Sequence, residues 1–229
     1  MLAALARLNY NAYLRIMFDC GESMREYEFT LPHAEPLMIV ISGPSGVGKD
    51  TVIQRMIERN LPFHFVVTAT TRPPRPNEVH GKDYFFYSQE QFTQMIARGE
   101  LLEHAIVYNE YKGIPKLQVT DALASGKDVI LRLDVQGAAT IRSLYPDALL
   151  IFISPQDEGE MINRLQQRKT ETPEGFKLRV AAAQAEMSQL ASFDYVVVNR
   201  ELHLDETVDT IDAIIVAEHH RVKPRKVSL

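Results

Sequence analysis

The amino-acid sequence predicts an α/β fold, with a parallel five-stranded core sheet that two insertions interrupt. Downstream of residue 36, short runs rich in β-branched residues alternate with helical patterns. This alternation is typical of parallel strands connected by crossover helices. A glycine-rich loop also joins the first of these strands to the first helix, which is the setting of a phosphate-binding loop. A chain of 229 residues is long enough for one large core but short for two ordinary domains.

Each element is predicted from an apolar run or from helical periodicity. The expected strands are residues 37–42, 64–68, 128–133, 148–153 and 195–198. The expected helices are residues 49–59, 136–145, 157–168, 176–190 and 204–222. Residues 70–125 form the first insertion, which we expect to hold polar loops and two short helices. Ser88 and Gln91 predict a capping box at the start of the first of these helices.

Composition and charge narrow the possible function classes. Hydrophobic residues make up 45% and charged residues 24% of the chain, as in soluble globular proteins. The formal net charge of −5 gives no general footprint for nucleic acid. No apolar run approaches the roughly 18–20 residues of a membrane span. Cys20 is the only cysteine, which excludes an internal disulfide and a cysteine-based metal site. We therefore expect neither nucleic acid nor a membrane as a partner.

Residues 1–36 differ from the rest of the chain. Their first half includes Arg7 and Arg15, lacks acidic residues and serine, and is moderately amphipathic. Organelle-targeting segments are basic and amphipathic too, but they are usually rich in serine. A dispensable extension, or a start that precedes the true initiator at Met24 or Met38, fits these features better. We therefore expect a cytoplasmic protein, with organelle targeting as the alternative.

The loop between the first strand and the first helix carries the strongest functional signal. Gly43, Gly46 and Gly48 let the backbone turn tightly, so that successive N–H groups converge on phosphate oxygens. The positive end of the helix dipole and the charge of Lys49 add to the attraction. A glycine-rich turn without a ligand is the alternative, but the flanking strand and helix favour nucleotide phosphate binding. The expected nucleotide-binding residues are Gly43, Pro44, Ser45, Gly46, Val47, Gly48, Lys49, Asp50 and Thr51.

The first insertion opens with a basic loop that proline stiffens. Arg72 and Arg75 lie three residues apart, among Pro73, Pro74 and Pro76. Proline fixes its own φ and restricts the residue before it. Two pre-organised guanidinium groups suit a dianionic phosphate, which accepts bidentate hydrogen bonds. In isolation a solvated basic loop would explain these residues equally well, but beside a phosphate-binding loop they predict the second phosphate site that a kinase needs.

With these features the chain resembles the guanylate kinase family from about residue 38 to residue 222. The resemblance rests on the phosphate-binding loop and on further motifs along the chain. These are Thr-Thr-Arg-x-x-Arg-x-x-Glu-Val-x-Gly-x-Asp-Tyr at 70–84, Glu-His-Ala at 103–105, Asp-Val-Gln-Gly at 134–137, Arg-Leu-x-x-Arg-x-Thr-Glu-Thr at 164–172 and Tyr-Val-Val-Val-Asn at 195–199. The resemblance implies a P-loop nucleoside monophosphate kinase fold, and transfer of the ATP γ-phosphoryl group to GMP in purine nucleotide metabolism. It also implies a kinase domain over 37–222, with a GMP-binding insertion at about 70–125, a lid at about 164–179 and a tail at 223–229.

Carried over residue by residue, the resemblance assigns roles to individual side chains. The GMP-binding residues would be Thr68, Arg72, Arg75, Tyr84, Glu103, Lys112 and Asp134. The catalytic residues would be Lys49, Arg72, Arg164, Arg168 and Arg179. Mg²⁺ would bridge the β- and γ-phosphates of ATP, with Asp50 as its candidate protein ligand. Without the motifs, the arginines of the lid would be the solvated face of an amphipathic helix and Glu103 an ordinary surface residue. ATP and GMP are the implied partners, and a homodimer is one assembly that fits.

The chemistry of the assigned residues suits guanine. Guanine presents N1–H and a 2-amino group as neighbouring donors, and a single carboxylate such as Glu103 accepts both. Adenine offers a bare N1 acceptor at the same place, which leaves the carboxylate unpaired. The acceptor oxygen of the GMP phosphate is already anionic, so the reaction needs no general base. Positioning and charge stabilisation therefore carry the rate.

Four residues depart from the common family pattern. Lys112 replaces a tyrosine and can still meet the GMP phosphate as a cation, whereas Ile114 replaces a serine or threonine and cannot give guanine a hydroxyl contact. Asp50 stands where serine or threonine usually follows the lysine, and Arg132 stands where an aspartate usually ends a strand. The acid and the base have thus changed sides, which predicts a salt bridge between Asp50 and Arg132. Two unrelated substitutions whose side chains point apart are the alternative. These residues look like the plant organelle-type branch of the family.

Two other functions stay open from the residues alone. One is a P-loop kinase for another phosphorylated small molecule, such as a ribose bisphosphate, although Thr68, Glu103 and Asp134 would then have nothing to recognise. The other is a catalytically inactive guanylate-kinase-like module that binds phosphopeptides. Against the module stand Lys49 and a chain with no room for a partner domain.

Overall fold

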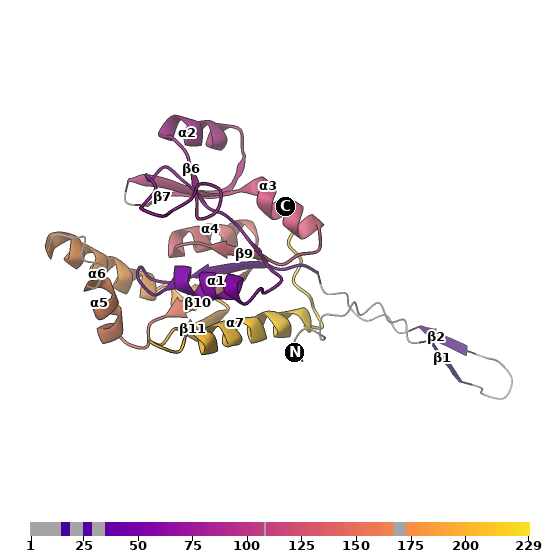
Figure 1. Ribbon diagram of the computed structural model, residues 1–229. Coiled ribbons are helices and arrows are strands. Elements are labelled where there is room, and N and C mark those ends of the chain that lie inside the picture. Colours follow the sequence, from indigo (N-terminus) through magenta and orange to yellow (C-terminus); the bar gives the residue numbers. More distant parts are fainter. Residues whose placement is uncertain (1–14, 19–24, 29–34, 108, 167–172) are drawn as a thin grey trace.

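A computed structural model of the protein describes residues 15–18, 25–28, 35–107, 109–166 and 173–229. At its centre is a five-stranded sheet with the strand order β11-β10-β3-β9-β4 (Figure 1), in which every neighbouring pair is parallel. The strands are β3 (Met38–Ser42), β4 (His64–Phe65), β9 (Val129–Arg132), β10 (Leu149–Ser154) and β11 (Tyr195–Val198). The predicted α/β fold with a parallel five-stranded core is therefore confirmed.

Helices cover both faces of this sheet. On one face lie α1 (Lys49–Glu58) and α7 (Leu204–His219), and on the other lie α3 (Lys116–Ala124) and α4 (Val135–Leu144). All four lie within two or three residues of the helices expected from periodicity or within the predicted insertion. The sheet is thus the middle layer of three.

The central strand β3 shows how the sequence specifies this layering. Ile39 and Ile41 point into the hydrophobic cluster under α1 and α7, whereas Met38 and Val40 point into the cluster under α3 and α4. Because both faces of the strand are buried, its sequence is hydrophobic throughout instead of alternating. Burial of each such side chain contributes roughly 1.5–3 kcal/mol.

Two helices that pack on each other follow β10. α5 (Glu158–Gln166) and α6 (Pro173–Met187) share a small cluster of buried residues around Met161, Leu165 and Ala183. A 3₁₀ turn at Leu190–Ser192 then leads into β11. Residues 169–175, which the sequence analysis left between the two expected helices, fall largely outside the described residues.

The first insertion holds a second sheet that the sequence analysis did not predict. Its four strands, in the order β6-β5-β8-β7, are β5 (Ala69–Thr70), β6 (Phe85–Phe86), β7 (Leu101–Val107) and β8 (Glu110–Pro115). The two expected helices are present as α2 (Gln89–Ala97) and α3. At the start of α2 the Ser88 hydroxyl accepts from the Gln91 N–H at 3.2 Å, and the Gln91 side chain accepts from the Ser88 N–H at 2.8 Å. The predicted capping box is confirmed, whereas the expectation of loops without a sheet was wrong.

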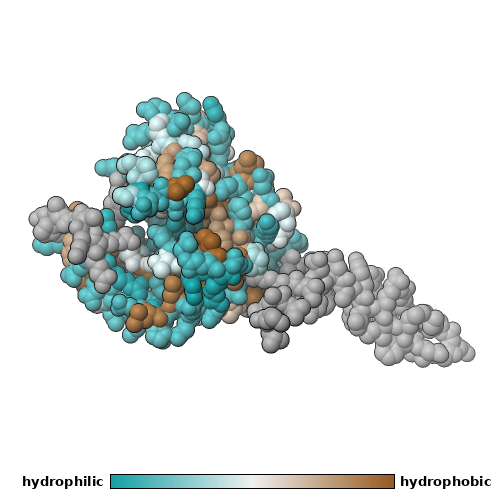
Figure 2. Space-filling model, in the orientation of Figure 1, coloured by the Kyte–Doolittle hydropathy of each residue, from teal (hydrophilic) through white to brown (hydrophobic). Residues whose placement is uncertain are grey.

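The N-terminal stretch contributes one described pair of strands. β1 (Arg15–Phe18) and β2 (Arg25–Glu28) pair antiparallel, with Arg15 opposite Glu28. Among the described residues no helix combines the length and the hydrophobicity that crossing a membrane requires. The face shown in Figure 2 is mostly hydrophilic, with small hydrophobic areas between the polar residues.

Candidate active site

The glycine-rich loop connects β3 to α1, as expected. The last residue before α1 is Gly48, with φ of 95°, and a Cβ there would lie 2.6 Å from the side-chain nitrogen of Asn199. A glycine is therefore required for both conformation and space. The Lys49 Nζ donates to the carbonyl oxygens of Gly43 at 2.6 Å and Pro44 at 3.1 Å, so the lysine folds back across the loop that it follows.

The charge of Lys49 is balanced by several neighbours. The pKa of Lys49 is lowered to about 8, mainly by burial and in smaller part by the nearby charge of Lys112. Three acids oppose this shift: Glu186, Asp50 and Asp134. The positive charge of Lys49 therefore lies near three carboxylates, which come from α6, from α1 and from the residue that caps α4.

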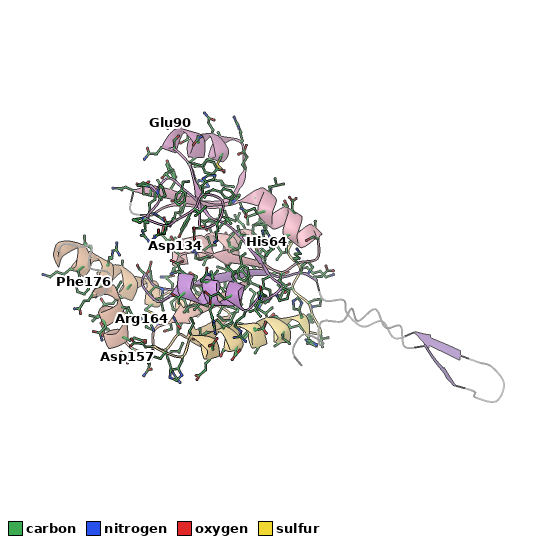
Figure 3. The ribbon with its side chains drawn as sticks, viewed as in Figure 1. His64, Glu90, Asp134, Asp157, Arg164 and Phe176 are labelled. Atoms are coloured by element: carbon green, nitrogen blue, oxygen red, sulfur yellow. The ribbon has the colours of Figure 1, made fainter. Side chains whose placement is uncertain are left out.

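Arg164, on α5, and Asn199, which follows β11, both hold the phosphate-binding loop. The Val47 carbonyl accepts from Arg164 Nη1 at 2.8 Å and from Asn199 Nδ2 at 2.8 Å. Arg164 Nη2 also donates to the Asn199 carbonyl at 2.7 Å and to the carboxylate of Glu160. Arg164 was expected among the catalytic residues; in the structure it joins α5, the loop and the end of β11 (Figure 3).

Glu186 is a further loop contact, which the sequence analysis did not identify. Its carboxylate, on α6, accepts from the backbone N–H of Ser45 at 2.9 Å. Burial raises the pKa of Glu186, while this hydrogen bond and Lys49 oppose the shift. No motif pointed to this residue, because a glutamate in a helix is indistinguishable from a surface residue until the helix is placed.

The basic loop of the first insertion is held by an acid of its own motif. Arg72 makes two hydrogen bonds to the Glu78 carboxylate, each of 2.8 Å, and the Arg75 N–H donates to Glu78 at 2.7 Å. The hydrogen bond with Glu78 raises the pKa of Arg72, and the same bond lowers the pKa of Glu78. The side chain of Arg72 is thus oriented, and Arg75 is exposed beside it.

Tyr84 lies between cations from the insertion and from the core. The guanidinium carbon of Arg72 lies 5.0 Å from the centre of the Tyr84 ring, and that of Arg132 lies 4.7 Å from it. Lys112, on β8, is half-buried, and burial lowers its pKa; Asp134, Arg132, Asp50 and Arg72 also influence it electrostatically. Three of the expected phosphate-binding residues, Arg72, Tyr84 and Lys112, therefore lie near one another.

The expected guanine-reading residues lie beside these cations. Glu103, on β7, is 4% exposed, and burial raises its pKa to about 7, with a further contribution from Asp134. Asp134 caps α4 by accepting from the Gly137 N–H at 2.8 Å, and Figure 3 shows it between the insertion and the core. The Thr68 hydroxyl is buried without a hydrogen-bond partner among the described residues. A buried acid, a half-buried acid and a buried hydroxyl without a partner suit a polar ligand.

Gly137 makes room for Glu103. A Cβ at position 137 would lie 3.0 Å from Glu103 Oε1 and 3.2 Å from the Leu133 Cδ2. The Asp-Val-Gln-Gly motif therefore supplies both an acid and the space for the other acid. The sequence signal for this role was a glycine inside a helical pattern. The sequence analysis included Gly137 in the motif but assigned it no function.

The predicted salt bridge between Asp50 and Arg132 is confirmed. Arg132 Nη1, at the end of β9, lies 2.7 Å from Asp50 Oδ1, at the start of α1. The side chain of Asp50 is 66% exposed, whereas that of Arg132 is 20% exposed. The pair lines a cleft of about 530 Å³ between α1, β4 and the insertion loop that carries Tyr84.

The remaining predicted residues are placed as follows. Thr51 is an exposed residue in the first turn of α1, and Arg179 is half-buried on α6. Ile114 is fully buried in β8, where it supports the sheet of the insertion. Arg168 lies outside the described residues.

Comparisons with known proteins identify the family. The sequence model of the family described as guanylate kinase matches residues 35–218. "Guanylate kinase 2, chloroplastic/mitochondrial" of Oryza sativa subsp. japonica is 51% identical over 199 residues, which cover 86% of this chain and 70% of that protein. The guanylate kinase of Bacillus subtilis (strain 168) is 44% identical over 193 residues, covering 82% of this chain and 94% of that protein. The crystal structure of guanylate kinase from Anaplasma phagocytophilum superposes with a TM-score of 0.69 at 30% identity, covering 82% of this chain and 89% of that one. The chain belongs to the guanylate kinase family.

Proposed function

We propose that the protein transfers the γ-phosphoryl group of ATP to GMP, giving ADP and GDP. The observation that carries this proposal is the burial of Glu103 beside Asp134 and the unpaired hydroxyl of Thr68, next to the cations around Tyr84. Such a site pairs a guanine-reading edge with a phosphate site. Its product would re-enter the purine nucleotide pool by GMP recycling.

Selection of guanine would depend on the ionised carboxylate of Glu103. Guanine N1–H and the 2-amino group would donate to its two oxygens, which relieves the cost of a buried charge. Asp134 and Thr68 would complete the edge. Adenine would leave the buried charge unpaired, so AMP would be rejected at the binding and the chemical step alike.

The phosphates would meet at the boundary between the insertion and the core. Arg72, Arg75, Tyr84 and Lys112 would hold the GMP phosphate, which is already an anion and needs no base. Residues 43–51 would cradle the ATP phosphates, with Lys49 on the transferring group. Arg164, Arg168 and Arg179 would add positive charge from the lid. Their combined effect is to stabilise charge on the transferred group, because the protein has little covalent chemistry to perform.

Asp50 fits the magnesium ion that ATP-dependent transfer implies. Mg²⁺ is usually held by one or two carboxylates together with substrate phosphates and water, and Asp50 is an exposed carboxylate in the first turn of α1. Arg132 engages one oxygen of that carboxylate. When bound, the ion would neutralise charge on the β- and γ-phosphates. Asp50 would orient it, and Arg132 would orient Asp50.

A coupled assay of ADP release tests the proposal. The purified full-length protein is supplied with ATP and, in parallel, with GMP, AMP or a ribose bisphosphate. We expect turnover with GMP that exceeds turnover with AMP by at least a hundredfold. Equal turnover of AMP and GMP contradicts the proposal. A preference for the sugar phosphate would support the alternative kinase, and failure to turn over any acceptor, with retained phosphopeptide binding, would support the inactive module.

The cellular location is a separate proposal. A cytoplasmic enzyme, with a homodimer as one assembly that fits, is the sequence-based expectation, and targeting by residues 1–36 is the alternative. The name of the rice relative assigns that protein to chloroplasts and mitochondria, which favours the alternative. Fusion of residues 1–36 to a fluorescent reporter distinguishes the two, because a diffuse signal supports the cytoplasm and a punctate or plastid signal supports targeting.

A further inference from the structure

A chain of side chains connects the phosphate-binding loop to the insertion. At one end Asp50, in the first turn of α1, pairs with Arg132 at 2.7 Å. Arg132 in turn lies 4.7 Å from the centre of the Tyr84 ring, and Arg72 lies 5.0 Å from the same ring. Glu78 holds Arg72 at the other end with two hydrogen bonds of 2.8 Å. We call these five residues the bridge.

Arg132 is the member of the bridge that joins two parts of the fold. It comes from the end of the core strand β9, whereas Tyr84 comes from the loop before β6 in the insertion. A guanidinium group is planar, so it can pair with a carboxylate through one edge while its face lies on an aromatic ring. A lysine would keep the ion pair with the carboxylate, but it has no planar group to lie on the aromatic ring. The residue type at position 132 is therefore matched to both neighbours.

We propose that Arg132 is a positioning residue that couples the two nucleotide sites, so that GMP and the adenine nucleotide each strengthen the binding of the other. The inference rests on the proposed function, because it takes Tyr84 to contact the GMP phosphate and Asp50 to adjoin the ATP phosphates. Whichever nucleotide arrives first fixes the bridge, and the second then pays a smaller ordering cost. Coupling of this kind is reciprocal by thermodynamic necessity.

The side chains of the bridge have space to move when a nucleotide binds. The cleft of about 530 Å³ is lined by four of its members, Asp50, Glu78, Tyr84 and Arg132. The side chain of Asp50 is 66% exposed. The bridge is thus not embedded in the hydrophobic core, and a change at one end has room to move the other.

The test measures ADP affinity without GMP and at saturating GMP, by titration calorimetry with magnesium held constant. ADP and GMP do not react, so the complex is stable during the titration. For the unmodified protein we expect GMP to tighten ADP binding about tenfold. In Arg132→Lys and Tyr84→Leu the effect should fall below about twofold, because both lose the contact between guanidinium and ring.

Two variants serve as controls in the same titrations. Tyr84→Phe keeps the ring, so it should retain the tenfold effect although GMP alone binds more weakly without the hydroxyl. Arg142→Lys alters another half-buried arginine, which pairs with Asp194 at 2.6 Å away from the site, and it should behave like the unmodified protein. Thermal unfolding checks that each variant folds.

The possible outcomes decide the matter. Unchanged coupling in Arg132→Lys or in Tyr84→Leu overturns the role of the bridge while leaving the proposed function intact. The absence of coupling in the unmodified protein, with both nucleotides bound, also overturns it. Failure of GMP to bind at all contradicts the proposed function itself, and the coupling falls with it.

Discussion

The carboxylate of Glu186 in α6 receives a hydrogen bond from the backbone N–H of Ser45, at 2.9 Å, although the two residues are 141 positions apart. The contact attaches α6 to the phosphate-binding loop. Because the carboxylate also lies near Lys49, it contributes both a hydrogen bond and a charge. A variant series separates the two contributions.

Glu186→Ala removes both, and we expect the KM for ATP to rise roughly tenfold, since a hydrogen bond to a charged group contributes about 1.5–3 kcal/mol. The KM for GMP should change less than twofold. Glu186→Gln keeps an acceptor oxygen and should lose less. Glu158→Gln is the matched control, because it removes a charge from the neighbouring α5 at an exposed site that pairs with Gln184. Equal increases in both KM values would mean that Glu186 supports the fold alone, and a lower KM for ATP would mean that it competes with the nucleotide.

Glu103→Gln should reduce kcat/KM for GMP by about 2–4 kcal/mol of transition-state stabilisation, which is about 30- to 900-fold. The carboxylate of Glu103 is charged and has two oxygens that accept from the two donors of guanine. The amide of glutamine is neutral and has only one acceptor oxygen. Steady-state kinetics with GMP and AMP measure the change. The preference for GMP over AMP should collapse with it; a variant that keeps the full preference would show that the base is read elsewhere.

The pH dependence of GMP use should report the same carboxylate. Burial raises the pKa of Glu103 to about 7 from its ordinary 4.5, so kcat/KM for GMP should fall as the pH drops below 7 and the carboxylate becomes protonated. The stability has the opposite dependence. The folded state holds this proton more tightly than the unfolded state, so the contribution of Glu103 to the free energy of unfolding is present below pH 4.5 and is lost as the pH rises to 7.

Denaturation at pH 5 and pH 8 measures that loss, which amounts to at most about 3 kcal/mol. Glu103→Gln should lack both the acid limb of the activity profile and this part of the decline in stability. If the variant and the unmodified protein have parallel profiles, another group is responsible.

The arginines of the insertion should act on one substrate and Lys49 on the reaction. Arg72→Ala and Arg75→Ala should each raise the KM for GMP far more than the KM for ATP, because the two anions occupy separate sites. Lys49→Ala should instead reduce kcat, since the lysine serves the transferring phosphates. Losses of similar size for both nucleotides in the arginine variants would assign those residues a structural role.

The pair formed by Asp50 and Arg132 predicts non-additive variants. An unpaired Asp50 beside the nucleotide phosphates would be repelled by roughly 4 kcal/mol per charge pair at 4 Å and an effective dielectric constant of 20. Asp50→Ser and Arg132→Asp should each lower kcat/KM, and the double variant, which restores the common family pattern, should recover part of the loss. Strictly additive losses in this double-mutant cycle would mean that the salt bridge is incidental.

The sequence predicted the structure best where a pattern of residues was compatible with only one arrangement. The core strands were predictable because residues buried on both faces form uninterrupted apolar runs, and the pairing of Asp50 with Arg132 was predictable because the two substitutions exchange charge. The sheet of the insertion was missed because in β7 a carboxylate, Glu103, is buried while an apolar side chain, Ile106, is exposed, which hides the alternating pattern of a strand. The roles of Glu186 and Asn199 were missed for another reason. Each acts on the loop from more than a hundred residues away, and such proximity exists only after the sheet has brought the segments together.

The narrow space at Gly137 constrains how the base preference could change during evolution or in the laboratory. The position of Glu103 depends on a residue that would touch no nucleotide, since any side chain at position 137 would reach the carboxylate. A library that varies only the residues around the base would therefore sample a pocket whose back wall is fixed. Redesign of this enzyme for a different nucleobase has to begin in helix α4, one layer behind the residues proposed to recognise the substrate.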